Sequence, residues 1–376
     1  MDAKEYRGLL QKTQIRQHWL PSTMQIHGDL IDTHVIVKKS KDVGRLFTKS
    51  RIGTPLPQNT LQLSLLEAAF LSDEKKIVLH SPQEAIHFKD LVSKAALIYE
   101  NFDVLFLVYR DLRKRGHCVQ EHLGKTDASL MIKEQPSKKQ PRIYIKIFSE
   151  RDFFDIKKIS ALLEKMHSLS SILWFAIVDE EGDITYYTVT QPELAGANKE
   201  YTHEKVKGLI LGHRVLLFDE QVSDQLFSRE FYGKPFGSGL QLSLVEALYL
   251  VQKKILTAYK TSSRKPLSAP SFRTYCTDIQ PDILQRLQVY RLLKQNGLLV
   301  KTGFKFGTHF RGYTQHPDEY HAEYLIHAVP ADFRRMWAEM SRAVRLAHAV
   351  NKDIVFASVH DDPHTLTFVS LGRLRP

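Results

Sequence analysis

Cysteine is nearly absent from this sequence: Cys118 and Cys276 are the only two among 376 residues. Two cysteines can form neither a disulfide framework nor a four-cysteine zinc site, and such sparse cysteine is typical of a reducing, intracellular compartment. The sequence also has no run of 18 consecutive apolar residues, and its charged start, MDAKEYRGLLQKTQIRQHWLP, has no apolar stretch of a signal peptide. We therefore expect a soluble, cytoplasmic protein with no membrane partner.

Acidic residues are outnumbered by basic ones. The 42 Asp and Glu stand against 53 Lys and Arg, which gives a formal net charge of +11. A positive excess favours polyanionic partners, because lysine and arginine neutralise phosphates and release counterions. Charge alone does not identify such a partner, since many basic proteins carry only a solvated basic surface.

The sequence contains an internal repeat. LQLSLLEAAFLSDEKKI at 61–77 returns as LQLSLVEALYLVQKKI at 240–255, with seven of the first eight residues identical. YRDLRKRG at 109–116 returns as YRLLKQNG at 290–297, and WFAIVDEEGDITYYTV at 174–189 parallels VFASVHDDPHTLTFVS at 355–370. The offset between the copies stays within 179 to 181 residues. Such a constant register indicates two copies of one fold.

Each copy is predicted to have two parts, and the first part mixes short strands with a helix. In the second copy the strand pattern is VLLF at 215–218. A helix over LQLSL and the residues after it is expected to follow, with Leu244, Leu248 and Val251 on its apolar face.

The second part of each copy is predicted to open with a helix, which spans about 281–296 in the second copy. Pro281 suits the first turn of such a helix and Gly297 suits its C-cap. Strands are expected at LLVKTGFKF, FRGY and EYLIHAV. A helix from about Asp332 to Asn351 and two strands, DIVFASV and TLTFVSL, complete the copy.

These patterns predict an α/β (α+β) fold class: two tandem repeats, each a small α+β N-terminal subdomain followed by a mixed-sheet α/β subdomain. The predicted segments are an N-terminal extension at 1–24, the first repeat at 25–191, a linker at 192–204, the N-terminal subdomain of the second repeat at 205–282 and its C-terminal domain at 283–376. The linker is polar and contains Pro and Gly. A Ser- and Pro-rich stretch, TSSRKPLSAPS at 261–271, is interpreted as a surface loop.

The two copies differ most in one stretch. GFKFGTHFRGYTQHPDEYHAEYLIHAV at 303–329 is rich in Tyr and His, whereas the first copy has MIKEQPSKKQPRIYIKI at 131–147. Three side chains of the second copy have no counterpart in the first, namely Tyr313, opposite Ile132 or Lys133, His321, opposite Pro141, and Lys352, opposite Ser171. Residues that serve the fold should recur in both copies, so these three are candidates for catalysis.

These segments resemble the archaeal tRNA-splicing (tRNA-intron) endonucleases of the internally duplicated, homodimeric type. GFKFGTHFRGY is similar to the strand and loop that carry their catalytic tyrosine, HAEYLIHAV to the strand that opens with their histidine, and RLAHAVNKDIVFA to the helix end with their lysine. The resemblance covers about 25–376. It implies an inactive, structural first repeat, a catalytic endonuclease domain at 283–376 and a homodimer of such chains.

The resemblance also implies the reaction. Precursor tRNA would be cut at bulge-helix-bulge exon–intron junctions by metal-independent attack of a 2'-OH, leaving 2',3'-cyclic phosphate and 5'-OH ends. Tyr313 would be the general base, His321 the general acid, and Lys352 the cation that stabilises the transition state. Histidine, with a reference pKa of about 6.5, suits proton donation near neutrality, whereas tyrosine, with a reference pKa of about 10, needs a nearby cation or a minor phenolate population. No cofactor and no metal are expected.

Further roles are implied by the resemblance. Two arginines of the family sandwich a bulged base, and the matching positions here are Arg345 and Arg373, with Arg375 as a rival for the second. The family also has an acidic loop that docks into a basic pocket of an active unit. The similar loop here, DEEGD, contains Asp179, Glu180, Glu181 and Asp183. Glu-Gly-Asp is equally good chemistry for an ordinary turn, and that alternative stays open.

Other functions are possible from the residues alone. Taken singly, Tyr313 fits a half-buried strand residue and Lys352 a solvated helix end. His316, His321 and His327 suggest zinc, but no cysteine or paired carboxylate completes a ligand set. A noncatalytic RNA-binding or structural subunit is the main alternative, and retention of the three candidate residues argues against it. A metal-dependent nuclease is a third hypothesis, and no Asp and Glu-x-Lys pattern supports it.

Overall fold

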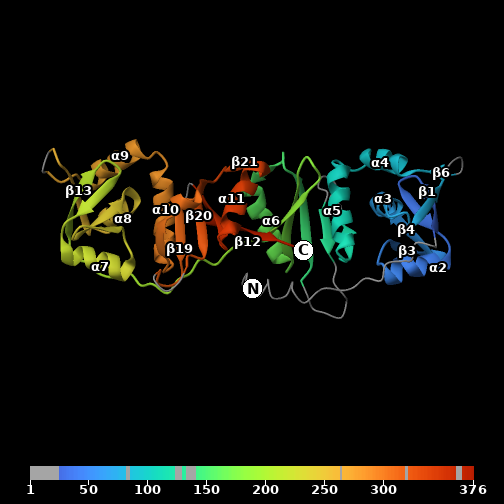
Figure 1. The fold of residues 1–376 in the computed structure, drawn as a ribbon, viewed down its shortest axis with the longest axis horizontal. Coiled ribbons are helices and arrows are strands. Elements are labelled where there is room, and N and C mark those ends of the chain that lie inside the picture. The colour runs from blue at the N-terminus through green and yellow to red at the C-terminus, as the bar shows by residue number, and fades with distance from the viewer. Residues whose placement is uncertain are drawn as a thin grey trace. The chain divides into compact units, whose positions relative to one another are not determined.

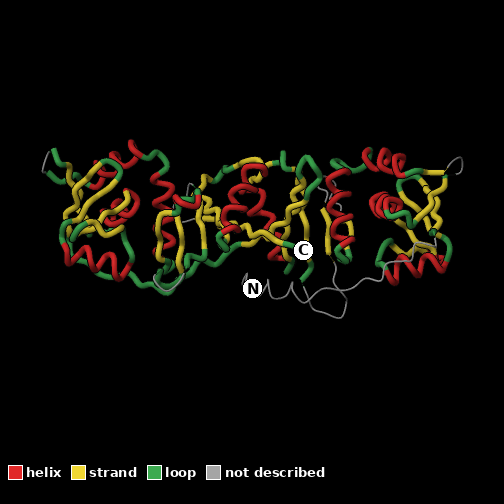
Figure 2. The backbone as a smooth tube through the Cα atoms, in the orientation of Figure 1, coloured by secondary structure: helices red, strands yellow, loops and turns green. Residues whose placement is uncertain are grey.

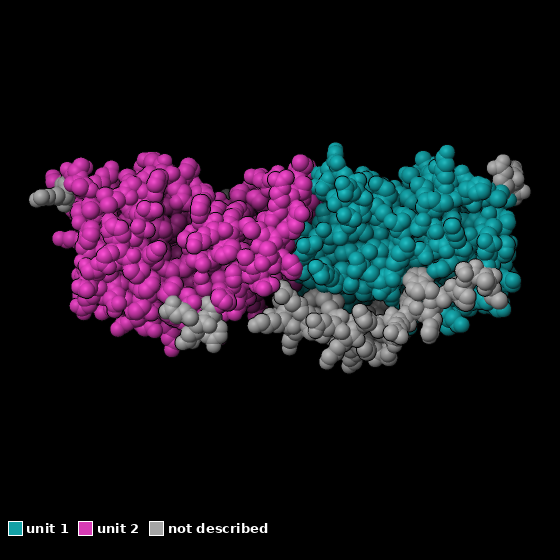
Figure 3. Space-filling model, viewed as in Figure 1, with its two compact units in different colours: residues 1–152, 164–188, 373–376 teal, residues 153–163, 189–372 magenta. Residues whose placement is uncertain are grey.

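A computed structural model describes residues 25–81, 85–122, 129–132, 141–262, 265–317, 321–360 and 366–376 (Figure 1). The predicted extension at 1–24 lies outside these residues. The chain forms two compact units, the first made of 1–152, 164–188 and 373–376, and the second of 153–163 and 189–372 (Figure 3). In the described part of the chain, no helix combines the length and apolar character needed to cross a bilayer.

The first unit begins with a small sheet and its helices. The sheet has the order β3-β4-β2-β1-β5-β6. Its strands are β1 (Ile26–Ile31), β2 (His34–Val37), β3 (Thr54–Leu56), β4 (Thr60–Ser64), β5 (Ile77–His80) and β6 (Ala85–Ile86). The helical segments are α2 (Ser40–Val43), the π-helix Gly44–Lys49, the 3₁₀ turn Pro57–Asn59, α3 (Leu65–Asp73) and α4 (Phe88–Ala96). β1 pairs antiparallel with β2 and parallel with β5, so the sheet is mixed.

The second unit contains a matching subdomain. Its five-stranded sheet has the order β15-β16-β14-β13-β17. The strands are β13 (Val206–Leu211), β14 (Arg214–Leu217), β15 (Lys234–Phe236), β16 (Gly239–Ser243) and β17 (Leu256–Lys260), and the helices are α7 (Glu220–Glu230), α8 (Leu244–Gln252) and α9 (Ala269–Ile279). β13 again pairs antiparallel with the next strand and parallel with β17, as β1 does with β2 and β5. The repeated topology confirms that the N-terminal subdomains are two copies.

The LQLSL motif is a strand followed by a helix, so the prediction of a helix over its first four residues was wrong. In the second repeat Leu240 and Leu242 are buried strand residues of β16, and the helix begins only at Leu244. The Ser243 hydroxyl accepts the Glu246 N–H, and the Glu246 carboxylate accepts the Ser243 N–H. This capping box marks the residue at which the strand, with its alternation of side chains, ends and the helix begins.

The C-terminal subdomain of the second repeat is a sheet flanked by two helices (Figure 2). The strand order is β18-β19-β20-β22-β23. The elements are α10 (Ile283–Gln295), β18 (Leu299–Thr302), a 3₁₀ turn at Phe304–Phe306, β19 (Phe310–Tyr313), β20 (Tyr324–Pro330), β21 (Arg334–Met336), α11 (Trp337–Ala349), β22 (Asp353–Val359) and β23 (Leu366–Leu374). β20 and β22 are parallel and the other neighbouring strands are antiparallel, which confirms the predicted mixed sheet.

The first repeat contains the same subdomain. Its strand order is β12-β11-β9-β8-β7. The elements are α5 (Phe102–Lys114), β7 (Val119–Glu121), β8 (Ser129–Ile132), β9 (Ile143–Ser149), β10 (Phe153–Asp155), α6 (Ile156–Ser168), β11 (Ile172–Val178) and β12 (Ile184–Thr190). β9 and β11 are parallel, as β20 and β22 are in the second repeat.

Three predicted boundaries differ from the structure. α10 starts at Ile283 with Asp282 as its N-cap, so Pro281 precedes the helix. At the other end Gly297 follows the C-cap residue and has φ +77°. The helix expected from about Asp332 begins only at Trp337, because Arg334–Met336 pair as a strand with β10. The stretch 261–271 is not all loop, since the Ser268 hydroxyl caps a helix that starts at Ala269.

The two subdomains of the second repeat share one apolar core. Helix α8 contributes Leu248 and Tyr249, and helix α10 contributes Leu287 and Tyr290, all at most 2% exposed. The rings of Tyr249 and Tyr290 meet edge to face at 5.4 Å. Burial of each such leucine contributes about 1.5–3 kcal/mol. This shared core holds the N-terminal subdomain in place against the sheet that carries the candidate site.

Candidate active site

The chain order of β19, β20 and β22 places three segment ends at one edge of the sheet. β19 runs antiparallel to β20, with Gly312 paired to Tyr324. β20 runs parallel to β22, with Tyr324 paired to Asp353. The end of β19 and the starts of β20 and β22 therefore lie side by side. Tyr313, His321 and Lys352 stand at or just outside these three points, so the fold brings the predicted catalytic residues to one edge.

Ala322 links the three segments. The Lys352 ammonium nitrogen donates a hydrogen bond of 2.7 Å to the Ala322 carbonyl. Ala322 and Tyr313 are both buried and belong to one small apolar cluster with Leu299. His321 immediately precedes Ala322. The lysine and the tyrosine thus meet at a single residue next to the histidine.

The three side chains differ in solvent access. Tyr313 is 7% exposed, Lys352 is half-buried and His321 is exposed. Burial, together with the positive charge of Arg311, lowers the pKa of Lys352 below its ordinary value. The edge therefore offers a sheltered phenol, a confined ammonium group and an imidazole open to a ligand.

Arg311 is a cation at this edge that the sequence reasoning missed. Its Nε donates to the Thr302 carbonyl at 2.9 Å, and its guanidinium carbon lies 5.8 Å from the centre of the Tyr313 ring. Residues two apart on a strand point to the same face, so the spacing in FRGY was a usable signal. Its charge adds to the positive potential around Tyr313 and Lys352.

Two further segments hold the chain after Tyr313. The Ala197 N–H, in the predicted linker, donates to the Thr314 carbonyl at 3.0 Å. The ring of Phe231, which follows α7, packs on the cluster that contains Tyr313 and meets His316 edge to face at 5.4 Å. Neither residue is distinguished by its type or spacing, and only the tertiary structure reveals them.

The candidate RNA-binding arginines lie on the surface. Arg345 is exposed on α11, and its Nε donates to the Ser341 carbonyl of the same helix at 3.3 Å. Arg373 is exposed on β23 and Arg375 is exposed just beyond it. Both belong to the first compact unit, whereas Arg345 belongs to the second.

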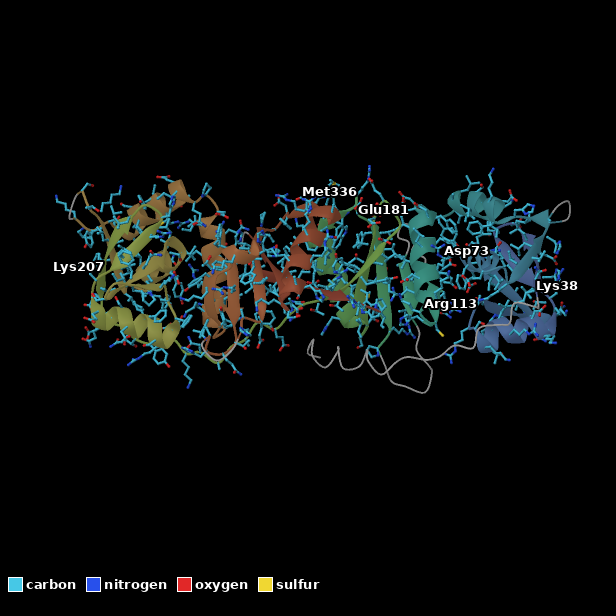
Figure 4. The ribbon with its side chains drawn as sticks, in the orientation of Figure 1. Lys38, Asp73, Arg113, Glu181, Lys207 and Met336 are labelled. Atoms are coloured by element: carbon cyan, nitrogen blue, oxygen red, sulfur yellow. The ribbon has the colours of Figure 1, made fainter. Side chains whose placement is uncertain are left out.

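The acidic loop is the turn between β11 and β12, and Figure 4 labels Glu181 in it. The Asp179 carboxylate accepts the N–H groups of Glu181 at 3.1 Å and Asp183 at 2.9 Å. Glu180 pairs with Arg151, and their side chains are 61% and 76% exposed. Asp179 therefore builds the turn, while the three carboxylates after it remain on the surface.

The same edge in the first repeat has other side chains. The pairing registers align the repeats here, because Ile132, Ile143 and Ile172 occupy the ladder positions of Gly312, Tyr324 and Asp353. In this alignment Tyr313 corresponds to Lys133, the second of the two alternatives, which lies outside the described residues. Arg311 corresponds to Met131. A cavity of about 640 Å³ opens at this place, and Met131, Pro141 and Ser171 are among its lining residues.

Two further histidines of the second repeat, His309 and His327, lie side by side. No group of three His, Cys, Asp or Glu is placed to hold a metal ion within the described ranges. His327 stacks on His309 at 4.2 Å. Burial, and then the neighbouring His327, lower the pKa of His309 to about 3, so this imidazole is neutral at pH 7.

Comparison with known proteins agrees with the duplicated architecture. The model of the tRNA intron endonuclease catalytic C-terminal domain matches residues 102–186 and 283–368, and that of the N-terminal domain matches 26–92 and 206–273. A tRNA-splicing endonuclease of Methanococcoides burtonii is 34% identical, over 93% of this chain and 100% of that protein. One from Methanosarcina barkeri is 34% identical over 90% and 96%, and one from Haloarcula marismortui is 28% identical over 91% and 98%.

Proposed function

Since this chain belongs to the tRNA intron endonuclease family, as an enzyme with two copies of both family domains, we propose that it cuts precursor tRNA by 2'-OH attack without a metal ion. The substrate is the bulge-helix-bulge structure at exon–intron junctions. Cleavage leaves a 2',3'-cyclic phosphate on one fragment and a 5'-OH on the other. The observation that carries this proposal is the convergence of Tyr313, His321 and Lys352 beside Ala322.

The reaction needs two proton transfers and one stabilised charge. Tyr313, as the phenolate, takes the proton of the 2'-OH, and the 2'-oxygen then forms its bond to phosphorus. His321, as the imidazolium, gives its proton to the 5'-oxygen while the bond from phosphorus to that oxygen breaks. Lys352 stabilises the negative charge that develops on the phosphoryl oxygens. Tyrosine and histidine exchange protonation states in one turnover, and the opposite transfers from water restore them.

Electrostatics at the site suits these roles. Positive charge near the reacting phosphate stabilises the negative charge that develops on it. Arg311 and Lys352 supply two cations on the Tyr313 side of the sheet. An exposed imidazole such as His321 is accessible to the leaving oxygen of an RNA bound at the edge.

RNA binding and assembly belong to the same proposal. Arg345 and Arg373 each offer a planar guanidinium group on which a bulged base can stack. Two chains form a homodimer in which the acidic loop of the first repeat binds a basic pocket of the other chain's second repeat. Reversal of charge at Glu180 and Glu181 together should dissociate this dimer in sedimentation velocity experiments, whereas Glu164→Lys, an exposed change on α6, should leave it intact.

The main test is cleavage of a bulge-helix-bulge RNA by the purified full-length protein in excess EDTA, followed by analysis of the RNA ends. Cleavage that persists and leaves a cyclic phosphate supports the mechanism. If EDTA abolishes cleavage and the products carry 5'-phosphate, the chain is a metal-dependent nuclease. Binding without cleavage, with or without Mg²⁺, would identify a noncatalytic RNA-binding subunit.

A further inference from the structure

Phe231 lies in one subdomain and packs on the small apolar cluster of the next that contains the candidate catalytic residue Tyr313. It follows the last residue of α7, inside the segment that matches the N-terminal domain of the family. Its ring packs against the buried cluster formed by Leu299, Tyr313 and Ala322. The N-terminal subdomain thus reaches the end of β19.

Several neighbours fix the position of this ring. Phe227 stacks on it with the ring centres 5.1 Å apart and the planes 22° from parallel. The Lys301 ammonium nitrogen lies 4.5 Å from the ring centre and also donates a hydrogen bond to the Gly233 carbonyl. On the side of the candidate site the ring meets His316, three residues after Tyr313, edge to face with the planes at 80°. Aromatic pairs and cation–π contacts of this kind are directional, so they orient the partners as well as bury them.

The backbone gives no reason for a phenylalanine at this position. Phe231 has φ +60°, and its N–H closes the helix on the Phe227 carbonyl at 2.9 Å. The left-handed conformation favours glycine and asparagine and is unfavourable for bulky side chains. The contacts of the side chain must therefore account for the aromatic residue.

The first repeat supplies the comparison. Arg51 occupies the same place after the same turn, with φ +51° and an N–H that donates to the Phe47 carbonyl at 3.2 Å. Lys301 of the second repeat corresponds to Gln120 in the first repeat. Arg311 of the second repeat corresponds to Met131 in the first. The two repeats thus share the left-handed turn, and only the repeat with the candidate catalytic residues has the aromatic ring.

We propose that Phe231 is a positioning residue for RNA cleavage. It acts through Tyr313 and His316: its ring holds the end of β19 and the segment after it in the geometry that the reaction needs. The N-terminal subdomain of the second repeat thereby sets the rate of the chemical step rather than the affinity for RNA. This inference rests on the function proposed above for Tyr313.

The test compares Phe231→Asn with Arg51→Asn in the full-length dimer. Asparagine tolerates the left-handed conformation, so both variants keep the turn and lose only the side chain. We expect Phe231→Asn to slow single-turnover cleavage about 10- to 100-fold, in keeping with the sensitivity of catalysis to misplacement by about 1 Å. The RNA dissociation constant should change less than about 3-fold, and Phe231→Tyr should restore most of the rate. Arg51→Asn should cleave like the unchanged protein.

A second measurement does not depend on cleavage. Amide hydrogen exchange of residues 313–317 should become faster in Phe231→Asn and remain unchanged in Arg51→Asn. Unchanged exchange together with an unchanged rate in Phe231→Asn would overturn the inference, as would a loss confined to RNA affinity. If the unchanged protein does not cleave RNA at all, the proposed function fails by itself, and the exchange data still decide whether Phe231 orders this segment.

Discussion

The two repeats show what the fold keeps when one copy lacks the candidate catalytic residues. Both copies have the parallel pair of strands, β9 with β11 and β20 with β22, and the same sheet edge beside it. In the second copy the Lys352 ammonium group binds a main-chain carbonyl at this edge. In the first, Ser171 and Pro141 line a cavity there. The architecture therefore does not need these side chains, which supports the catalytic role proposed for them.

The largest effect is expected from His321. Replacement by alanine removes the proposed general acid for the leaving 5'-oxygen, so cleavage should slow by roughly 10²- to 10⁴-fold. Single-turnover cleavage with saturating enzyme measures it. The matched control is Pro141→Ala at the corresponding edge of the first repeat, which should leave the rate unchanged. Equal losses in both variants would mean that the edge has a structural role in each repeat.

Lys352→Met should slow cleavage by about 10²- to 10³-fold, the usual loss when a group that stabilises transition-state charge is removed. Methionine keeps much of the apolar stem but cannot donate to Ala322. Ser171→Ala, at the matching position of the first repeat, serves as the control. A Lys352→Met enzyme with normal rate and weakened RNA binding would assign the lysine to substrate binding instead.

Arg311→Met, which copies the residue of the first repeat, should have a smaller effect, about 10-fold on the rate at neutral pH. Arg311 contributes to the lowered pKa of Lys352, second to burial. Without Arg311 that pKa rises, so the loss of activity on the alkaline side should move to higher pH. A pH–rate profile measures this shift. A shift to lower pH would contradict the proposed proximity of the two cations.

The smallest effect on cleavage is expected from the capping-box glutamate of the first repeat. Burial, with Glu121 as a lesser cause, raises the pKa of Glu67 to about 7. A carboxyl group with a raised folded-state pKa binds more protons when folded, so the stability it contributes is lost as the pH rises from about 4.5 to 7. Glu67→Gln should flatten this pH dependence of the unfolding free energy, measured by urea denaturation, without changing cleavage. An unaltered slope would show that Glu67 does not titrate in that range.

Much of the fold could be predicted from the sequence because the same pattern of apolar and polar residues occurs in both copies. Strands such as FRGY and DIVFASV follow from their apolar and β-branched residues. The start of α11 was misplaced because Arg334–Met336 become a strand only by pairing with β10, more than 150 residues away in the chain. The LQLSL error was local, and the capping Ser–x–x–Glu was a sufficient signal to avoid it.

The candidate site was predicted only in part, for a physical reason. Tyr313, His321 and Lys352 are chemically distinctive and absent from the sister copy, so comparison within one sequence reveals them. Phe231 and Ala197 act through position alone. A phenyl ring and a backbone N–H carry no signature in sequence, and their contacts with the segment after Tyr313 exist only once the subdomains have packed.

The shared core of α8 and α10 bears on how this gene could have arisen. Tyr290 of α10 meets Tyr249 of the preceding subdomain and Phe310 of its own sheet, and Leu287 and Leu293 are buried in the same core. A duplication that copied the C-terminal subdomain alone would have left this apolar face open to water and prone to aggregation. The unit repeated in this sequence is accordingly the pair of subdomains, since each of the two family domains matches twice in the same order.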